Sequence, residues 1–551
     1  MKQTLALILR FLVVLALGAG AILLAMALNS NMEGYRSPLK DMPPAPGKTF
    51  GEPLSERLVI VLIDGLRYDT AENTEVMPSL NQLRNLGASA KMYSHPPSYS
   101  SPGYGVILTG AWPSINDLPP FNLDYENYYP LSQDNIFSAA KRHGLRTAIS
   151  SYYWFEKIIL PEAIDIGFFT PDKDQKADRR VVNAAIPWLE EDEYELVFIH
   201  LNQVDYAGHH EGGPAKENWN KAAQRVDNLL LEISSKLNYS KDTLLIISNH
   251  GHIDRGGHGG HDAVTLLEPF VLIGKGVNAG VYEDIYLVDV APTVAAILGT
   301  NLPASTQGRV LTEMLRMPDD SSQTLKNETA RQQAQLLASY ASAIGVPLPE
   351  EATDIDASLG VSGYQKVFQK LQRDKLSRER LVRLAITAAG FLALLILIAV
   401  LKPKELKMLL AAWFVFTVLF HVVILTLGPK GYSYSTIRSV PQFLLLNGSN
   451  TLLALGVTWL LFTFQNWAKM DLKQNFNKLI DLTLFLMALT AIPLIAHIAW
   501  NGLFAKWILP NFFIHYMALL SLIQVFSMAV GTLLLVITAI FILLSKRRKT
   551  A

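Results

Sequence analysis

Potential metal ligands gather where three apolar runs of this sequence end. In the segment SNHGHIDRGGH, His250 closes the apolar run LLIIS and His258 follows on a glycine-rich loop. Asp205 and His209 form an Asp-x-x-x-His pair after the run LVFIHLNQ, and Asp64 closes the run LVIVLID. Because α/β proteins carry their chemistry at the carboxyl ends of strands, we expect these side chains to converge at one edge of a sheet.

Carboxylates and imidazoles are ligands of zinc and of harder divalent ions such as manganese. Two such ions about 4 Å apart neutralise phosphate oxygens, activate a nucleophile and stabilise a leaving group. The segment SYSSPGYGVILTG offers three hydroxyl nucleophiles, Ser98, Ser100 and Ser101, and spacing alone does not select among them. A serine at a helix N-terminus would feel the helix dipole and could bind a metal as its alkoxide. His252 and His261 are two further imidazoles in the same region.

The elements that must position these residues lie between residues 58 and 312. Apolar runs alternate there with amphipathic stretches such as ENWNKAAQRVDNLLLEISSKL. This alternation predicts an α/β domain with a mainly parallel sheet flanked by helices. Residues 29–57 are rich in Pro, Gly and Lys and are expected to form a linker, and residues 313–380 a polar helical connector.

The composition is that of a membrane protein. Half of the residues are hydrophobic and 17% are charged, with a mean hydropathy of +0.22. Residues 1–28 are a transmembrane anchor or a signal peptide, and we favour the anchor because the run is long for a signal. Residues 381–546 contain five apolar stretches, each able to span a bilayer: 382–401, 408–428, 441–465, 479–500 and 512–545.

Loop charges orient these spans. The basic connections 402–407 and 466–478 and the terminal SKRRK fall on one side of the membrane if every stretch spans. The positive-inside rule makes that side cytoplasmic and puts residues 29–380 outside the cell, with the spans in the plasma membrane. The basic patch 372–383 then lies on the outer side, where we expect an amphipathic helix touching anionic lipid headgroups.

Taken together, the motifs DGLRYD, Ser-x-Pro followed by LTG, D-x-x-x-H, NHG and GGHGG resemble the alkaline-phosphatase superfamily. Within it, residues 57–312 are most similar to type I phosphodiesterases and nucleotide pyrophosphatases. The resemblance implies that Ser100 is the nucleophile and forms a phospho-enzyme. It also implies two divalent ions, zinc or alternatively manganese. Asp64, Ser100 and His250 would bind one ion, and Asp205, His209 and His258 the other.

Two residues depart from the family pattern. Asn249 stands where the family has the Asp of DHG, and Gly103 stands where nucleotide-cleaving members often have Asn. An amide oxygen can still ligate a metal, so Asn249 stays a candidate ligand. Because the amide brings no charge, the ion at Asp64, Ser100 and His250 is expected to bind more weakly. The Gly103 difference removes support for a nucleotide substrate.

Several functions stay open. The first is an outward-facing, membrane-anchored phosphodiesterase or phosphatase. The alternative is a phospho-group transferase, for example of phosphoethanolamine, on a lipid or lipid-linked glycan. The domain order resembles glycolipid ethanolamine-phosphate transferases, and five C-terminal spans exceed what anchoring needs. A third is an inactive relative that only binds, because of Asn249.

Other classes are disfavoured. A sulfatase is disfavoured because the chain has no cysteine and Tyr104 stands where arginine would be needed. Zero net charge argues against a nucleic-acid partner. The partners expected are a phosphate ester and membrane lipids, and the sequence does not give the oligomeric state.

Overall fold

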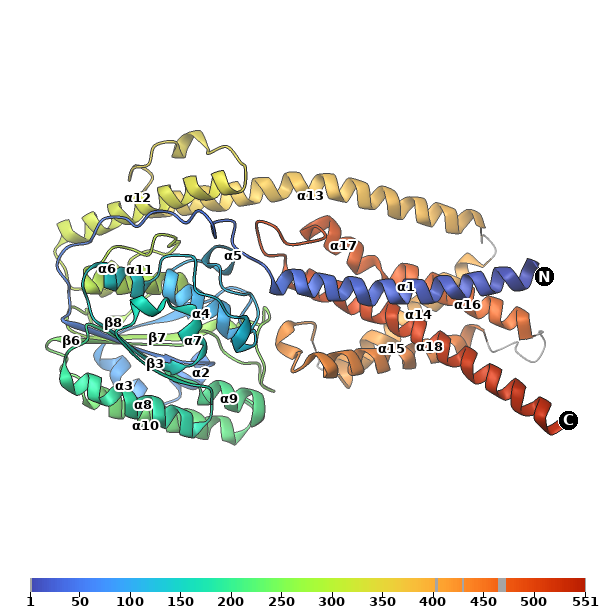
Figure 1. The fold of residues 1–551 in the computed structure, drawn as a ribbon, viewed down its shortest axis with the longest axis horizontal. Helices are drawn as coiled ribbons and strands as arrows, with labels where there is room; N and C mark the ends of the chain where they lie inside the picture. The colour runs from blue at the N-terminus through green and yellow to red at the C-terminus, as the bar shows by residue number, and fades with distance from the viewer. Residues whose placement is uncertain (1, 402–404, 429–430, 464–471, 551) are drawn as a thin grey trace. The chain divides into compact units, whose positions relative to one another are not determined.

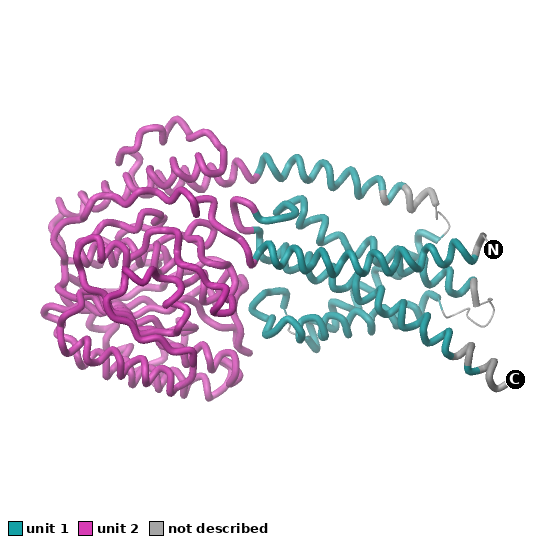
Figure 2. The backbone as a smooth tube through the Cα atoms, viewed as in Figure 1, with its two compact units in different colours: residues 1–32, 377–505, 510–551 teal, residues 33–376, 506–509 magenta. Residues whose placement is uncertain are grey.

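The computed structural model describes residues 2–401, 405–428, 431–463 and 472–550. The chain divides into two compact units (Figure 2). We call residues 33–376 with 506–509 the sheet unit, and residues 1–32, 377–505 and 510–551 the helical unit. The predicted linker and connector therefore belong almost entirely to the sheet unit.

The sheet unit contains nine strands in one mixed, mostly parallel sheet (Figure 1). Its order is β4-β3-β5-β1-β6-β7-β2-β8, and β9 also pairs with β2. β7 runs antiparallel to both β6 and β2, whereas the other pairings are parallel. The strands are β1 (Arg57–Ile63), β2 (Ala88–Tyr93), β3 (Thr147–Tyr152), β4 (Ile166–Thr170), β5 (Leu196–Leu201), β6 (Asp242–Ile247), β7 (Leu267–Gly274), β8 (Gly280–Val281) and β9 (Ile285–Tyr286). The predicted α/β class is confirmed.

Helices cover both faces of the sheet, as the apolar runs predict for buried strands. Strand β1 shows this directly. Leu58, Ile60 and Leu62 pack into one hydrophobic core, and the alternate Val59 and Val61 pack into the other. The helices of the unit are α2 (Tyr68–Glu72), α3 (Pro78–Leu86), α4 (Ser100–Thr109), α5 (Pro113–Asn116), α6 (Ile136–Arg142), α7 (Trp154–Ile158), α8 (Gln175–Glu191), α9 (Gln203–His210), α10 (Glu217–Ser235), α11 (Val290–Leu298), α12 (Asp319–Ala343) and the first part of α13 (Gly360–Leu401).

The stretch expected to be a linker is held by specific contacts. The guanidinium of Arg36 donates two hydrogen bonds to the carboxylate of Asp117, at 2.9 and 2.6 Å. The backbone N–H of Ser37 donates to the same carboxylate, and Thr49 forms a β-bridge with Asn301. Proline and glycine content alone predicted a linker, but these side chains and backbone groups tie the segment to the domain.

The helical unit consists of α1 (Lys2–Glu33), the end of α13, α14 (Leu406–Thr426), α15 (Val440–Phe462), α16 (Leu472–Thr490), α17 (Ile492–Asn501) and α18 (Phe512–Thr550). Five described segments are long and apolar enough to cross a membrane: Thr4–Glu33, Leu406–Thr426, Val440–Phe462, Gln474–Asn501 and Phe512–Phe541. The predicted span 382–401 forms the end of α13 and is not among these five. The basic connections at 402–404 and 466–471 lie outside the described residues.

Arg10 interrupts the first apolar run, and the fold gives it a partner. Its guanidinium lies 2.9 Å from the carboxylate of Asp481 on α16. A charge within a membrane-type helix is costly unless it is paired. The ion pair therefore ties α1 to the C-terminal helices of the same unit.

Candidate metal centre

The predicted ligands follow three neighbouring strands of the sheet. β1 lies between β5 and β6, and all three run parallel. The register pairs Ile63 with Leu201 and Leu62 with Ile247, so the three strands end at the same level. The ladder continues by one step, because the backbone N–H of Asp64 donates to the carbonyl of Leu201 at 2.8 Å. Asp64, helix α9 and the NHG segment therefore leave the sheet side by side.

The first cluster joins Asp64, Ser100 and His250. The Oγ of Ser100 lies 3.5 Å from Oδ1 of Asp64 and 3.2 Å from Nε2 of His250. The remaining pair, Asp64 Oδ1 and His250 Nε2, is 3.1 Å apart. Ligands about 2.0–2.1 Å from a tetrahedral zinc ion lie about 3.3 Å from one another, so this triangle has the size of a zinc face. All three side chains are fully buried.

The second cluster joins Asp205, His209 and His258. Oδ1 of Asp205 lies 3.4 Å from Nε2 of His209 and 3.3 Å from Nε2 of His258. The two imidazole nitrogens are 2.8 Å apart. Asp205 and His209 share one face of α9, which is the one-turn spacing that the sequence predicts.

Hydrogen bonds set the tautomers of His250 and His258. Nδ1 of His250 lies 3.1 Å from the carbonyl of Gly251, and Nδ1 of His258 lies 2.8 Å from the carbonyl of Ser98. A carbonyl only accepts, so each Nδ1 carries the proton and each Nε2 presents a lone pair to the cluster. A lone pair 3.1 Å from a carboxylate oxygen of Asp64 requires a cation between them, either a proton or a metal ion. Both rings therefore have the tautomer of a metal ligand.

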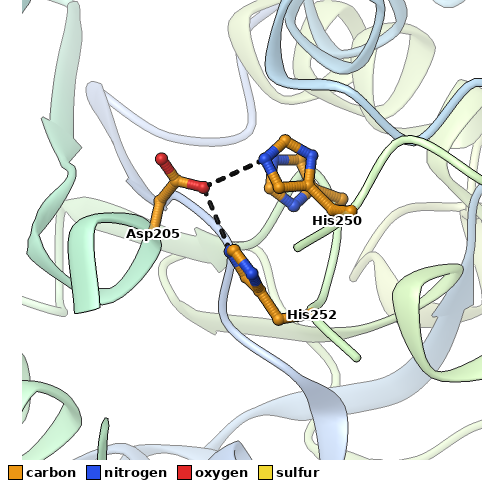
Figure 3. Close-up of side chains that lie close together, drawn as sticks. Asp205, His250 and His252 are labelled. Atoms are coloured by element: carbon orange, nitrogen blue, oxygen red, sulfur yellow. Dashed lines mark hydrogen bonds and ion pairs between the residues drawn. The ribbon is translucent and has the colours of Figure 1, made fainter. Parts of the chain in front are cut away.

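Figure 3 shows His250 and His252 beside Asp205. Ligand atoms of Asp205, His250, His252 and His258 all lie within 4.8 Å of one another, and all four residues are buried. The rings of His250 and His258 stack at 3.8 Å between centroids, which brings the two clusters together. The residues present thus fit the predicted metal pair in donor type, spacing and tautomer.

His252 has the opposite tautomer. The backbone N–H of Gly257 donates to its Nδ1 at 2.9 Å, so the neutral ring carries its proton on Nε2. That Nε2 lies 3.1 Å from Oδ1 of Asp205 and donates to it. Burial lowers the pKa of His252 to about 4, which keeps the ring neutral. Gly208 leaves room for this ring, because a Cβ there would come within 2.3 Å of the imidazole.

His200 has the same tautomer as His252 and donates in the same way to the carboxylate of Asp64. The backbone N–H of Tyr152 donates to Nδ1 of His200 at 3.4 Å, and Nε2 of His200 lies 2.9 Å from Oδ2 of Asp64. The Tyr104 hydroxyl donates to the same oxygen. Each buried carboxylate is therefore held by an imidazole whose tautomer a backbone amide sets, a common arrangement around metal ligands.

These contacts keep the carboxylates charged. Burial alone would raise the pKa of Asp64, but the hydrogen bond from His200 and the interaction with His250, whose Nε2 must carry a proton when no metal ion is bound, outweigh it and hold the pKa well below its usual range. Burial would also raise the pKa of Asp205, but electrostatic attraction to His209 and the contacts with His209, His252 and His258 keep it low. Both carboxylates are thus ionised at neutral pH, as metal ligands must be.

Asn249 does not present its oxygen to the first cluster. Its Oδ1 accepts the backbone N–H of Gly65 at 3.3 Å, and its Nδ2 donates to Oδ1 of Asp64 at 3.0 Å. The N–H of Gly65 sets this amide orientation. The sequence suggested Asn249 as a ligand; in the structure its amide is a hydrogen-bond donor to the carboxylate of Asp64. Gly103 adjoins it, since a Cβ at Gly103 would lie 3.0 Å from the Asn249 Cβ, so the two departures from the family pattern touch each other.

The other candidates lie apart from the clusters. The Ser98 hydroxyl accepts the N–H of Gly259 and donates to the carbonyl of Gly260, so it braces the glycine-rich loop. The backbone N–H of Ser101 donates to Asn122. His261 is exposed. Of the three serines, Ser100 is the one whose hydroxyl contacts Asp64 and His250.

One cation near the site was not foreseen. Nζ of Lys173 lies 4.0 Å from Oδ2 of Asp205 and packs over the rings of Tyr152 and Trp154, at 4.5 and 4.7 Å from their centroids. The local sequence around Lys173 does not indicate a place beside Asp205. The fold of the loop after β4 brings the residue to that carboxylate. For His200 there was a signal, a histidine inside the otherwise apolar run LVFIHL.

The model of the type I phosphodiesterase / nucleotide pyrophosphatase family matches residues 58–334. The chain belongs to this family. The match starts at the predicted first residue of the domain and extends past the predicted end at 312. Membership confirms the predicted class, enzymes of phosphate-ester chemistry.

Among curated proteins, this phosphodiesterase-family chain is similar to GPI ethanolamine phosphate transferases. It is 24% identical over 298 residues to the human GPI ethanolamine phosphate transferase 2 catalytic subunit, covering 49% of this chain and 30% of that protein. It is 25% identical over 309 residues to the human transferase 3 catalytic subunit, covering 50% of this chain and 27% of that protein. The alignments thus cover less than a third of each human protein's length.

Similar solved structures include murine ectonucleotide pyrophosphatase / phosphodiesterase 5, with 12% identity, a TM-score of 0.38 and coverage of 45% of this chain and 96% of that one. A mutant of alkaline phosphatase PafA is 11% identical, with a TM-score of 0.40 and coverage of 48% and 100%.

Proposed function

We propose that this chain is a metal-dependent phospho-transferase that moves a phosphoethanolamine-type group from a phosphodiester donor to a hydroxyl of a lipid or lipid-linked glycan. The observation that carries this is the similarity over about 300 aligned positions to GPI ethanolamine phosphate transferases, together with the family match over residues 58–334, which hold both ligand clusters. The apolar helices of the helical unit support a lipid substrate. This was the alternative interpretation from sequence, and it replaces the simple phosphodiesterase as our first choice.

Two divalent ions would neutralise the phosphate oxygens and lower the pKa of the nucleophile. Asp64, Ser100 and His250 would hold one ion, with Asn249 donating to Asp64 rather than ligating. The histidine-rich donor set suits zinc, with manganese as the alternative.

Asp205, His209 and His258 would hold the second ion. His200 and His252 act as positioning residues, because they donate to the two carboxylates and fix the oxygens that face the ions. Lys173 adds a positive charge beside the second cluster, where a substrate phosphate would gain from it.

Ser100 carries the covalent step. Its Oγ attacks phosphorus, the bond from phosphorus to the donor alcohol breaks, and that alcohol leaves with the serine proton. The acceptor hydroxyl then attacks the phosphoserine, loses its proton and breaks the Oγ–P bond, which regenerates the Ser100 hydroxyl. The N-terminus of α4, where Ser100 lies, favours the negative charge that develops on this oxygen.

Transfer and hydrolysis differ in the second step. The assay uses the purified full-length chain in lipid nanodiscs that contain a headgroup-labelled phosphoethanolamine lipid. The label should appear on an acceptor glycolipid, and a digest of the quenched reaction should contain labelled phosphoethanolamine bound to Ser100. Ser100→Ala should abolish both signals, whereas the matched neighbour Ser101→Ala should keep them. Release of the headgroup to water with or without acceptor would instead establish a hydrolase, and equal turnover by Ser100→Ala would refute the site.

We further propose that the sheet unit faces away from the cytoplasm, as the positive-inside rule suggests. The chain has no native cysteine, so single cysteines can report on orientation without background labelling. A cysteine at exposed Val281 of the sheet unit should react with an impermeant maleimide on intact cells. Labelling only after lysis would contradict the proposed orientation of the sheet unit.

A further inference from the structure

The middle of α13 carries a basic segment that the proposed reaction does not use. This helix is continuous from Gly360 to Leu401. Between Ser377 and Arg383 it has three arginines and one glutamate, which give a net charge of +2. From residue 381 to its end, Arg383 is its only charged residue. The basic segment therefore ends where the helix becomes apolar enough to lie in lipid.

A second helix ends its apolar segment at the same place. The segment Gln474–Asn501 is long and apolar enough to cross a membrane, and Trp500 lies at its end. Nε of Arg380 donates to the backbone carbonyl of Trp500 at 3.1 Å, so α13 and α17 meet at the point where the apolar segment of each one ends. Trp500 is 46% exposed, and tryptophan is enriched at membrane–water interfaces. The headgroups of a surrounding bilayer would lie at this contact.

Arg380 presents an uncompensated positive charge at this contact. Its Cζ lies 4.0 Å from the ring centroid of Trp500, so the guanidinium stacks on the indole. In the described part of the chain Arg380 has no carboxylate partner, and its two terminal nitrogens have no hydrogen-bond acceptor and are not buried. Arg383, by contrast, is paired with Glu379. The free edge of the Arg380 guanidinium can therefore bind a phosphate through two parallel hydrogen bonds.

Apolar side chains continue from Arg380 along the same face of α13. Ser377, Arg380, Leu381 and Leu384 are spaced by three and four residues, which puts them on one side of the helix. Ser377 is exposed, and Leu381 and Leu384 are 68% and 55% exposed. A hydroxyl and a guanidinium thus precede two exposed leucines along the helix. A ligand with a phosphate at one end and hydrocarbon chains at the other matches this order.

We propose that Arg380 and Trp500 bind the phosphate of an anionic phospholipid, whose acyl chains lie along Leu381 and Leu384. A headgroup without an ammonium is favoured, because the segment is cationic and its one carboxylate, Glu379, already pairs with Arg383. The lipid would hold α13 against α17 at the membrane surface. This binding does not involve Ser100, so it is independent of the proposed transfer reaction.

Native mass spectrometry of the full-length chain in detergent tests this preference. The chain is mixed with equal amounts of dioleoyl phosphatidylglycerol and dioleoyl phosphatidylcholine, and the bound lipids are compared. The wild type should retain phosphatidylglycerol about fivefold more than phosphatidylcholine. Arg380→Gln should remove most of this preference. Arg331→Gln removes an exposed arginine of α12 and is the matched control, which should keep the wild-type ratio.

Trp500→Leu gives a second test, because it removes the ring under the guanidinium and keeps the charge. It should reduce the preference for phosphatidylglycerol, and melting temperatures in detergent would identify any variant that loses its fold. The proposal is overturned if the wild type shows no preference, or if both folded variants keep it. Equal loss in Arg331→Gln would show a general effect of net charge instead. Displacement of the lipid by an equal concentration of glycerol 3-phosphate would show a site for free phosphate and would also overturn it.

Discussion

Replacing Asn249 with aspartate should make the fold depend on metal. Nδ2 of Asn249 donates to Oδ1 of Asp64 at 3.0 Å, so Asn249→Asp removes a donor and sets two carboxylates about that far apart. At an effective dielectric constant of about 20, two unit charges at this distance repel by about 5 kcal/mol. Protonating an ordinary aspartate at pH 7 costs about 4 kcal/mol, which is less. The metal-free variant should therefore take up a proton and lose about 4 kcal/mol of stability at pH 7.

The pH dependence has a definite sign. The pKa of the new carboxyl is raised in the folded state, so the folded variant binds more protons than the unfolded one. Its stability relative to wild type should fall as pH rises from about 4 toward the raised pKa, by about 1.4 kcal/mol per pH unit. A divalent ion between the carboxylates removes the repulsion, so zinc or manganese should restore most of the loss.

Thermal melts by tryptophan fluorescence, after chelation and after adding metal back, measure this effect. Asn249→Ala is the matched control, because it removes the same hydrogen bonds without adding charge. It should lose about 1–3 kcal/mol at every pH, and metal should not restore it preferentially. A metal-free Asn249→Asp protein that melts like wild type from pH 5 to 8 would refute the placement of this amide against Asp64.

Two further predictions concern buried groups. His252→Leu should weaken metal binding about 10–100-fold by removing the donor to Asp205, whereas His252→Gln, which keeps an N–H near that position, should recover much of the affinity. Equal losses in isothermal titration would mean that His252 is itself a ligand. Glu268→Gln should raise the melting temperature at pH 8 more than at pH 5. Burial raises the pKa of Glu268 well above its usual range, so wild-type stability falls as pH rises past about 4.3. A pH-independent difference would contradict this.

Local sequence was enough to find the candidate ligands. Asp64, Asp205 and His250 each follow a run of apolar residues, and parallel strands must end at one edge of their sheet. The prediction of both clusters needed the family resemblance as well, because spacing could not choose Ser100 over Ser98 or Ser101. The structure brings the Ser100 hydroxyl to Asp64 and His250.

Some predictions differed for physical reasons. The segment 29–57 was expected to be a linker because composition indicates chain flexibility but not contact partners. In the structure Arg36 donates hydrogen bonds to Asp117, which lies 81 positions away in the sequence. Asn249 was proposed as a ligand because its side-chain oxygen can bind metal, but in the structure that oxygen accepts a hydrogen bond from the backbone N–H of Gly65. An amide orientation depends on neighbours that no local pattern specifies.

The sequence alone determined the fold class, the apolar helices and the residue types that can bind metal, because hydrophobic periodicity and side-chain chemistry are local properties. Tertiary structure decided how those residues are used. His258 and His252 have the same side chain, and they differ in whether Nδ1 meets a carbonyl, as in His258, or a backbone N–H, as in His252. That choice depends on backbone groups brought close by the fold, which is why reading along the chain could not make it.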